Sequence, residues 1–332
     1  MYNYIGIDVS KATLQVHIPI KDENISIDNS KKSIKTLYSK LKKYYKKEYK
    51  DLVFIFESTG SYSSVLKYFC AEHNIYAYII NPRQSANFAR ALDNRSKSDI
   101  IDAKMLYKFH VLLKIDAITV PAIDYTKESI GEALSYYRLI VKQRNAFTNH
   151  LEAINAKENK SFIIKQLQKD IQKLKRQEEK LLEEIIQIIK EDDVLANKFE
   201  IIKSFQGVGD LSAMVLLHLF ISYPDANRQE ITALSGLDCV ENTSGTSLHK
   251  RSKISKRGNT LYRGTLFMPV LVAVRYNPYM KAFYERLKKN GKHSNAAHIA
   301  VMRKIILITH AMYKNSQPFN AELYESQIGW CK

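Results

Sequence analysis

The sequence is poor in cysteine and in acidic residues, and it has no long apolar run. Its three cysteines, Cys70, Cys239 and Cys331, form no Cys-x-x-Cys pair, which argues against a disulfide framework and a thiolate zinc site. The longest apolar stretch, residues 265–274, is about half of the roughly 20 residues that span a bilayer, so no transmembrane helix is expected. The N-terminus lacks the basic and long apolar regions of a signal peptide. These absences together predict a cytoplasmic protein.

The shortage of acids leaves a strongly basic chain. Its 332 residues, enough for about two domains, carry 51 Lys plus Arg against 34 Asp plus Glu, a formal net charge of +17. Residues 250–314 hold fifteen Lys or Arg and one acid, Glu285, and so contribute +14 of this excess. A basic segment of this kind indicates a polyanionic partner, and nucleic acid is the first candidate.

The first third of the chain alternates between patterns typical of strands and of helices. Apolar or alternating runs predict strands, the first two close enough to form a hairpin, at residues 4–9, 13–20, 52–56 and 75–80. Periodic stretches predict helices at 31–49 and 61–73, and two more after Asn81-Pro82, the second covering 98–113. This order favours a mixed α/β sheet.

The rest of the chain reads as mainly helical. Residues 126–192 contain no proline and one glycine, and their apolar positions recur at helical spacing, which predicts an antiparallel helical hairpin. The hairpin is interpreted as a coiled-coil spacer, with a direct DNA or RNA contact and a role in oligomerisation as alternatives. From residue 194 onward we expect helices with two glycine-containing breaks, and a loop over residues 235–255.

Four acidic residues occupy positions from which their carboxylates could converge on a phosphodiester. Asp8 and Glu57 each follow a predicted strand, and Asp99 and Asp102 are three apart on a predicted helix, so both project from one face of that helix. Four converging carboxylates repel one another unless divalent cations neutralise them, and oxygen ligands suit Mg²⁺ or Mn²⁺. Singly, each acid also fits a turn, a cap or a helix-dipole contact. Their joint order is that of an RNase H-like nuclease.

Actin-like ATPases and sugar kinases begin with the same strand and hairpin, but they also need glycine-rich phosphate loops. Only eleven glycines occur here, and neither a second such loop nor a Walker-type sequence is present.

Further features are individually weak. Gly207 and Gly209 precede an apolar helix, an arrangement that suits either a phosphate contact or a plain turn between helices. Ser244 stands beside Gly245, just before a cationic cluster, where a serine is able to attack a phosphodiester, although most loop serines have no such role. His218 is interpreted as a core residue rather than a base.

The whole pattern resembles the DEDD transposases of the insertion-sequence family one-ten, the group that includes the Piv DNA invertase. The resemblance covers nearly the entire chain and rests on nine short motifs in the family's order and spacing. They are Gly-Ile-Asp-Val-Ser-Lys (6–11), Glu-Ser-Thr-Gly (57–60), Asn81-Pro82, Phe88-Ala89, Lys-Ser-Asp-Ile-Ile-Asp-Ala (97–103), Gly207-Val208-Gly209, Ser235-Gly236-Leu237, Ser244-Gly245, and Ile-Ser-Lys-Arg-Gly-Asn (254–259) with Arg263.

The resemblance implies a RuvC-like catalytic domain over residues 1–120, a coiled-coil hairpin over 121–193 and a transposase domain over 194–332. It implies RNA-guided recombination of DNA by a homodimer or homotetramer in a bacterial or archaeal cytoplasm, associated with the nucleoid. Asp8, Glu57, Asp99 and Asp102 would bind Mg²⁺ or Mn²⁺, and Ser244 would form a covalent phosphoserine link to DNA. Nucleic-acid contacts are expected from Lys11, Gly207, Gly209, Lys250, Arg251, Lys253, Lys256, Arg257 and Arg263.

The departures from the family pattern are mild. Lys97-Ser98-Asp99 stands where Lys-Thr-Asp is commoner, and Tyr262 stands where an aliphatic residue is more usual. Ser247, three residues after Ser244, is the alternative nucleophile. The competing functions are a site-specific DNA invertase of the same group, a metal-dependent RuvC-like junction nuclease that would not need Ser244, and a DNA- or RNA-binding protein without catalysis.

Overall fold

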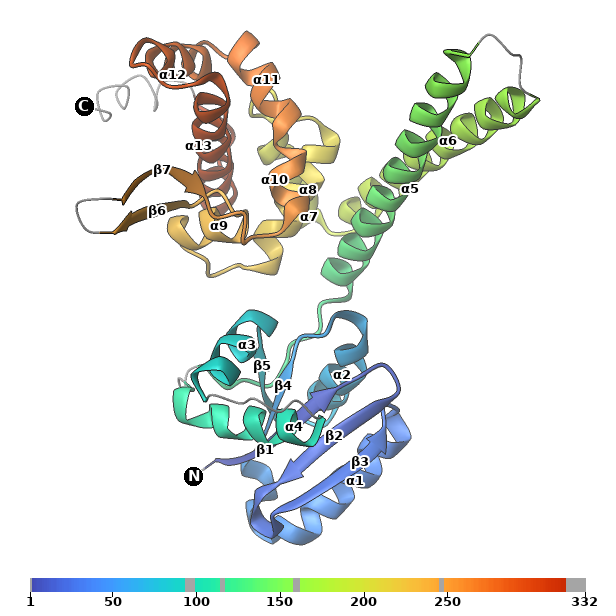
Figure 1. The fold of residues 1–332 in the computed structure, drawn as a ribbon, viewed down its shortest axis with the longest axis vertical. Helices are drawn as coiled ribbons and strands as arrows, with labels where there is room; N and C mark the ends of the chain where they lie inside the picture. The colour runs from blue at the N-terminus through green and yellow to red at the C-terminus, as the bar shows by residue number, and fades with distance from the viewer. Residues whose placement is uncertain (1, 93–98, 114–116, 158–161, 245–247, 321–332) are drawn as a thin grey trace. The chain divides into compact units, whose positions relative to one another are not determined.

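The protein was analysed as a computed structural model, which describes residues 2–92, 99–113, 117–157, 162–244 and 248–320; the side chains of residues 99 and 241–251 lie outside this description. The chain forms two compact units, residues 1–124 and 125–332. The first unit is a mixed α/β sheet domain and the second is mostly helical, as the sequence predicts (Figure 1).

A five-stranded sheet organises the first unit. Its strands are β1 (Asn3–Val9), β2 (Thr13–Ile18), β3 (Glu23–Asp28), β4 (Leu52–Glu57) and β5 (Tyr76–Ile80), in the order β3-β2-β1-β4-β5. β1, β2 and β3 pair antiparallel, whereas β4 pairs parallel with both β1 and β5. The sequence analysis missed β3, because this edge strand buries none of its side chains completely and its apolar alternation is limited to Ile25 and Ile27.

Helices cover both faces of this sheet. α1 (Lys31–Tyr45) and α2 (Ser64–Glu72) share an apolar core with one set of strand side chains, and α4 (Asp99–Lys108) packs with the other set. β4 shows the alternation directly, since Phe54 and Phe56 face the first core and Val53 and Ile55 face the second. α3 (Pro82–Ala91) contributes Phe88 to the second core. Short 3₁₀ turns at residues 19–21, 46–51, 60–63 and 109–112 complete the unit.

Gly6 of β1 is required for the close packing of α4. A Cβ atom at this position would lie 2.2 Å from the Ala103 carbonyl oxygen and 2.5 Å from the Tyr107 amide nitrogen. Both are backbone atoms and neither is able to move aside without shifting the helix. The absence of a side chain at residue 6 therefore sets the distance between α4 and the sheet.

We predict that Gly6→Ala lowers the free energy of unfolding of the first unit by about 3 kcal/mol, because the methyl group forces the helix and the sheet apart. Urea denaturation followed by circular dichroism measures the change. Gly264→Ala is the control, since the Cβ there meets nothing within 4 Å and lies in a helix, so that alanine should stabilise by about 0.5–1 kcal/mol. Equal stability of wild type and Gly6→Ala would contradict the packing argument.

The second unit begins with two long helices, α5 (Tyr125–Asn155) and α6 (Ile163–Lys190), which pack along one another (Figure 1). Arg144 Nε and Glu178 Oε1 pair across them at 2.6 Å. Near the other end of the pair, Ile130 and Leu134 of α5 join the same core as Ile185 and Ile189 of α6. The two helices thus share apolar core with the rest of the unit.

The remaining helices enclose that core. They are α7 (Asp193–Lys203), α8 (Asp210–Ser222), α9 (Arg228–Leu234), α10 (Thr260–Thr265), α11 (Phe267–Tyr276), α12 (Pro278–Lys289) and α13 (Ser294–Asn315). α8 and α13 each supply more buried apolar side chains to this core than any other helix of the unit. In the described part of the chain, no helix is long and apolar enough to cross a membrane.

The loop expected over residues 235–255 is wrong, because most of this segment forms a two-stranded hairpin. β6 (Cys239–Ser244) pairs antiparallel with β7 (Leu248–Ile254), with a register shift between Val240 and Asn242. The abundance of Ser, Thr, Asn and basic residues suggested a loop. Instead, these polar residues lie on a ribbon with no third strand among the described residues, and such a ribbon does not need the apolar alternation by which strands are recognised.

Candidate active site and nucleic-acid interface

Asp8 and Glu57 lie at the carboxyl ends of two neighbouring parallel strands. The register pairs Ile7 with Phe56, so the next residue of each strand is Asp8 on β1 and Glu57 on β4. Directly paired residues of a sheet point to the same face, and this face is the one on which Val53 and Ile55 pack with α4. Continued by one residue, this register places Asp8 and Glu57 at neighbouring positions on one face, and their joint role stays a prediction.

α4 runs antiparallel to β1 across this face. Tyr4 near the start of β1 stacks on His110, just after α4, with ring centroids 4.9 Å apart. Gly6, further along β1, lies beneath Ala103 and Tyr107. The amino-terminal turn of α4, with Asp99 at its first residue and Asp102 one turn later, is therefore directed toward the Asp8 end of the strand.

Ser85 is a site residue that the sequence analysis missed. Its hydroxyl donates a hydrogen bond to Glu57 Oε1, and the side chain is buried on α3. α3 begins at Pro82 with Asn81 as its cap, the Asn81 side chain accepting from the Arg83 amide. α3 starts directly after β5, so its first turn passes the end of the neighbouring strand β4. A residue in this turn, such as Ser85, is therefore placed near Glu57.

The donor set suits a hard divalent cation, because it consists of carboxylate oxygens only. Among the described side chains, however, no group of three or more His, Cys, Asp or Glu lies close enough to hold a metal ion. The Asp99 side chain is outside the description. The residues fit Mg²⁺ or Mn²⁺ in chemistry, and the convergence of all four carboxylates stays a prediction.

Ser244 lies at the end of β6, paired with Leu248 of β7. Gly245, Thr246 and Ser247 lie outside the described residues. The hairpin is anchored at its base, where the Arg303 guanidinium donates from Nε and Nη2 to the Leu237 carbonyl oxygen at 3.1 and 2.5 Å. The candidate nucleophile is therefore carried on a paired strand and not on a loop.

The predicted nucleic-acid contacts differ in their surroundings. Lys253, Lys256 and Arg257 follow or end the hairpin and are exposed, as is Lys11 between β1 and β2, whereas the side chains of Lys250 and Arg251 are outside the description. Arg263 has a structural contact, since its Nη1 donates to the Ser235 carbonyl at 3.3 Å.

The Gly207–Gly209 turn has a packing explanation. Gly207 has φ +112°, and a Cβ there would lie 3.0 Å from the Pro269 carbonyl oxygen, so the residue needs both its backbone conformation and its lack of a side chain. Gly209 caps α8, and the first helical residue is Asp210, whose Oδ1 pairs with Lys203 Nζ at 2.8 Å. A carboxylate at this helix start competes with a phosphate, so the surroundings favour the structural alternative for this turn.

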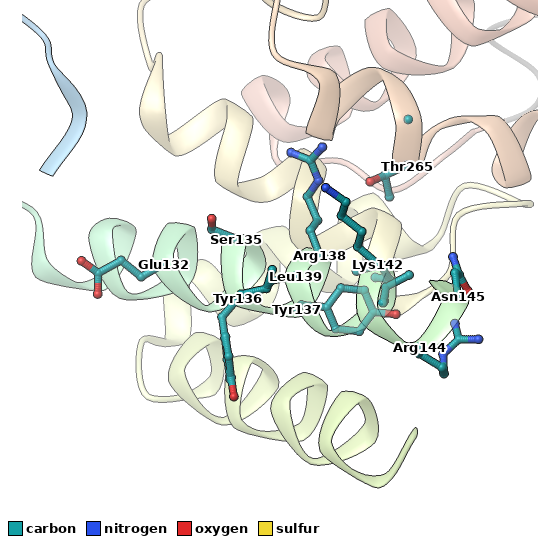
Figure 2. A pocket seen from close by; sticks show the side chains of 13 residues that line it. Glu132, Ser135, Tyr136, Tyr137, Arg138, Leu139, Lys142, Arg144, Asn145 and Thr265 are labelled. Atoms are coloured by element: carbon teal, nitrogen blue, oxygen red, sulfur yellow. The ribbon is translucent and has the colours of Figure 1, made fainter. Parts of the chain in front are cut away.

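α5 borders a large cationic groove that the sequence analysis did not identify. The cavity has a volume of about 990 Å³, and Leu211, Gly264 and Thr265 line it from the other side. Figure 2 shows Arg138 and Lys142 projecting from α5 toward the segment that carries Thr265, and Arg138 Nη2 donates to Thr260 Oγ1 at 3.2 Å. In the sequence, the indication of this groove is that Arg138 and Lys142 are four residues apart on a helix and therefore lie on the same face of it.

His218 is half-buried on α8, which favours its interpretation as a packed residue over that as a base. Burial, with a smaller contribution from Lys127, lowers its pKa to about 4, so the imidazole is neutral at physiological pH. Its Nδ1 lies 3.2 Å from the Tyr262 hydroxyl, whose own pKa is raised by burial. This pair joins α8 to α10.

Comparisons with known proteins agree with this arrangement. A family model described as a transposase, for the DEDD domain, matches residues 5–154, and the model of the transposase IS116/IS110/IS902 family matches residues 199–285. The pilin gene-inverting proteins of Moraxella bovis and Moraxella lacunata are each 26% identical over 331 residues, covering 97% of this chain and 99% of theirs. The matches extend over both structural units. The chain belongs to the IS110 family of transposases and is a DNA transposase or recombinase.

Proposed function

We propose that this protein is the RNA-guided transposase of an insertion sequence, cleaving and exchanging DNA strands with a DEDD carboxylate tetrad and a serine nucleophile. The observation that carries the proposal is the pairing of Asp8 and Glu57 at the ends of adjacent parallel strands, with the start of α4 directed toward them. A protein that only binds nucleic acid has no need of carboxylates at such a position, because they repel phosphate.

In this proposal the first unit is a RuvC-like domain and α5 and α6 form a coiled-coil hairpin that assembles a homodimer or homotetramer. The chain then has three functional parts: the RuvC-like domain over residues 1–120, the hairpin over 121–193 and the transposase domain over 194–332. The packing of α5 along α6 and the Arg144–Glu178 pair support the hairpin.

The tetrad of Asp8, Glu57, Asp99 and Asp102 would hold Mg²⁺ or Mn²⁺. Such ions supply an activated attacking oxygen and stabilise the leaving oxygen of a phosphodiester. Ser85 acts by holding one oxygen of Glu57, which leaves the other oxygen available as a ligand.

Ser244 would attack the phosphorus of a DNA strand. A bond forms between its Oγ and the phosphorus while the bond from phosphorus to one deoxyribose oxygen breaks. The serine proton leaves to a base and the departing oxygen takes up a proton. The neighbouring Lys250, Arg251, Lys253, Lys256 and Arg257 would offset the charge of the pentavalent phosphorus.

A second candidate, a site-specific DNA invertase, is favoured by the two pilin gene-inverting relatives, which align over nearly the full chain. An invertase would break and join DNA strands by the same chemistry but would connect the ends in a different arrangement. A junction nuclease needs the carboxylates but not Ser244.

We expect the protein, expressed with its flanking DNA, to copurify with one structured RNA and to form protein-linked DNA ends in the presence of Mg²⁺. Guidance by base pairing requires the RNA, and a phosphoserine intermediate requires the adduct. RNA sequencing of the purified complex and denaturing electrophoresis of labelled DNA measure the two outcomes. Absence of both RNA and adduct under these conditions would overturn the proposal.

A further inference from the structure

A second cavity lies in the C-terminal unit between α9, α12 and α13. Its volume is about 390 Å³, near the lower end of the roughly 300–1,000 Å³ typical of small-ligand sites. Both α9 and α12 pack against α13, and Figure 1 shows them near opposite ends of that helix. A cavity of this size suits one nucleotide and is too small for a duplex.

Three cations line the cavity and no acid does. They are Arg228 of α9 and Arg303 and Lys304 of α13. Arg228 is the first residue of α9, where the helix dipole disfavours positive charge. The acid in this turn, Glu230, accepts a hydrogen bond from the Asn227 amide at 2.8 Å as part of a capping box.

The charge of these groups is not balanced within the described residues. Lys304 Nζ lies over the ring of Phe283, 5.0 Å from its centroid, and is in no ion pair there. The described residues offer no hydrogen-bond or ion-pair partner to the Arg228 guanidinium. Arg303 uses Nε and Nη2 on the Leu237 carbonyl, which leaves Nη1 for another acceptor. Because like charges repel, an anion bound between them would stabilise their convergence.

The other walls are apolar. Phe283 comes from α12, and α13 adds Leu307 and Ile308 with the small residues Ala300 and Ala311. Spacings of three and four residues place them on the same face of α13 as Arg303 and Lys304, and Leu307, Ile308 and Ala311 form an apolar stripe next to the two cations. A ligand that matches both parts combines an anionic group with a flat, largely apolar body.

The cavity also adjoins the root of the β6–β7 hairpin. Arg303 binds the carbonyl of Leu237, and its Nη2 lies 3.1 Å from Cys239 Sγ, where β6 begins. Ser244 is five residues further along this strand, about 17 Å at the rise of an extended chain.

We propose that this cavity binds one unpaired nucleotide of a DNA strand, with a phosphate at Arg228, Arg303 and Lys304 and the base against the apolar stripe of α13. The chemistry follows from the charge and the shape of the cavity, and DNA follows from the family to which the chain belongs. The inference does not depend on Ser244 or on the carboxylate tetrad.

The test uses full-length protein and a fluorescein-labelled single-stranded DNA 12-mer, with binding followed by anisotropy. Arg228→Gln combined with Lys304→Met is expected to weaken binding about tenfold or more relative to wild type. Lys281→Met combined with Lys289→Gln is the matched control, since both lysines are exposed on α12 outside the cavity and the same charge is removed. The control should weaken binding by less than about twofold.

Two further arms separate the possible sources of the effect. A 12-mer whose bases are replaced by abasic sites should bind wild-type protein more weakly than the intact strand does, because the cavity then has no base to hold. Free dAMP should compete with the labelled strand for wild-type protein, and inorganic phosphate at the same concentration should not. Circular dichroism checks folding, and Arg228→Gln alone, which removes no contact within the described residues, is the second variant if the double variant does not fold.

Equal loss in the control variant would overturn the proposal, because it would show only general attraction of DNA to a basic surface. Equal binding of the intact and the abasic strand by wild-type protein, or competition by phosphate as strong as by dAMP, would overturn base recognition and show an anion site only. Competition by dAMP without any effect of the variants on strand binding would place the ligand in the free nucleotide pool. The binding assay needs no bond to form or break at Ser244, so failure of the proposed nucleophile leaves this test intact.

Discussion

Ser244→Ala is expected to abolish the covalent protein–DNA adduct. Alanine lacks the hydroxyl oxygen that forms the bond to phosphorus, so no linked intermediate accumulates, and strand exchange falls by at least about 1,000-fold. Radiolabelled substrate DNA incubated with protein and Mg²⁺, then separated under denaturing conditions before and after protease treatment, measures the adduct. Mass spectrometry of the linked peptide identifies the modified residue.

Ser247→Ala is the control, because this serine is only three residues away in the sequence. It should retain the adduct, and both variants should bind DNA as wild type does. An adduct that survives in Ser244→Ala and disappears in Ser247→Ala would transfer the role to Ser247. Full cleavage by Ser244→Ala with free 5′-phosphate ends would favour the junction nuclease.

Asp8→Asn is expected to lower metal-dependent cleavage by about 1,000-fold or more. Asparagine keeps the size of the side chain but removes the negative charge that attracts and holds a divalent cation. The same loss is expected for Glu57→Gln, since the two residues end paired neighbouring strands. Cleavage is followed with a preassembled DNA substrate across a titration of Mg²⁺ and Mn²⁺.

A measurement that does not depend on activity separates metal binding from folding. Mn²⁺ should raise the melting temperature of the wild-type protein, because a ligand that binds only the folded state stabilises it, and this rise should vanish in Asp8→Asn. Asp28→Asn is the matched control: Asp28 ends the edge strand β3, is exposed, and lies outside the site. Asp8→Asn with wild-type cleavage and a wild-type Mn²⁺ shift would exclude Asp8 from the metal site.

The strands rich in apolar residues were predicted from the sequence, whereas the mostly polar strands were missed. β1, β2, β4 and β5 bury dense apolar runs, and such runs are visible in sequence. β3 and the β6–β7 hairpin are formed by mostly polar segments with few apolar side chains, whose pairing supplies backbone hydrogen bonds. Their pairing partners decide their conformation, and these partners cannot be read from local composition.

The same distinction holds for the candidate site. Asp8 and Glu57 were identified because each follows an apolar strand. Ser85 does not follow an apolar strand, so the sequence does not single it out. Its contact with Glu57 exists only because α3 passes the end of β4. Arg263 was predicted to contact nucleic acid, whereas the fold directs its guanidinium to the Ser235 carbonyl.

By itself the sequence determined the class of partner, the apolar strands and the main helices, and the carboxylates available for metal chemistry. These follow from net charge, from periodicity and from residue type, all of which are local properties of the chain. Only the tertiary structure decided that β1 and β4 are neighbours, that Gly6 admits α4 close to the sheet, and that Arg228, Arg303 and Lys304 share one cavity. The reason is physical: strand register, helix packing and the convergence of distant charges arise from contacts between residues far apart in sequence, which no local pattern specifies.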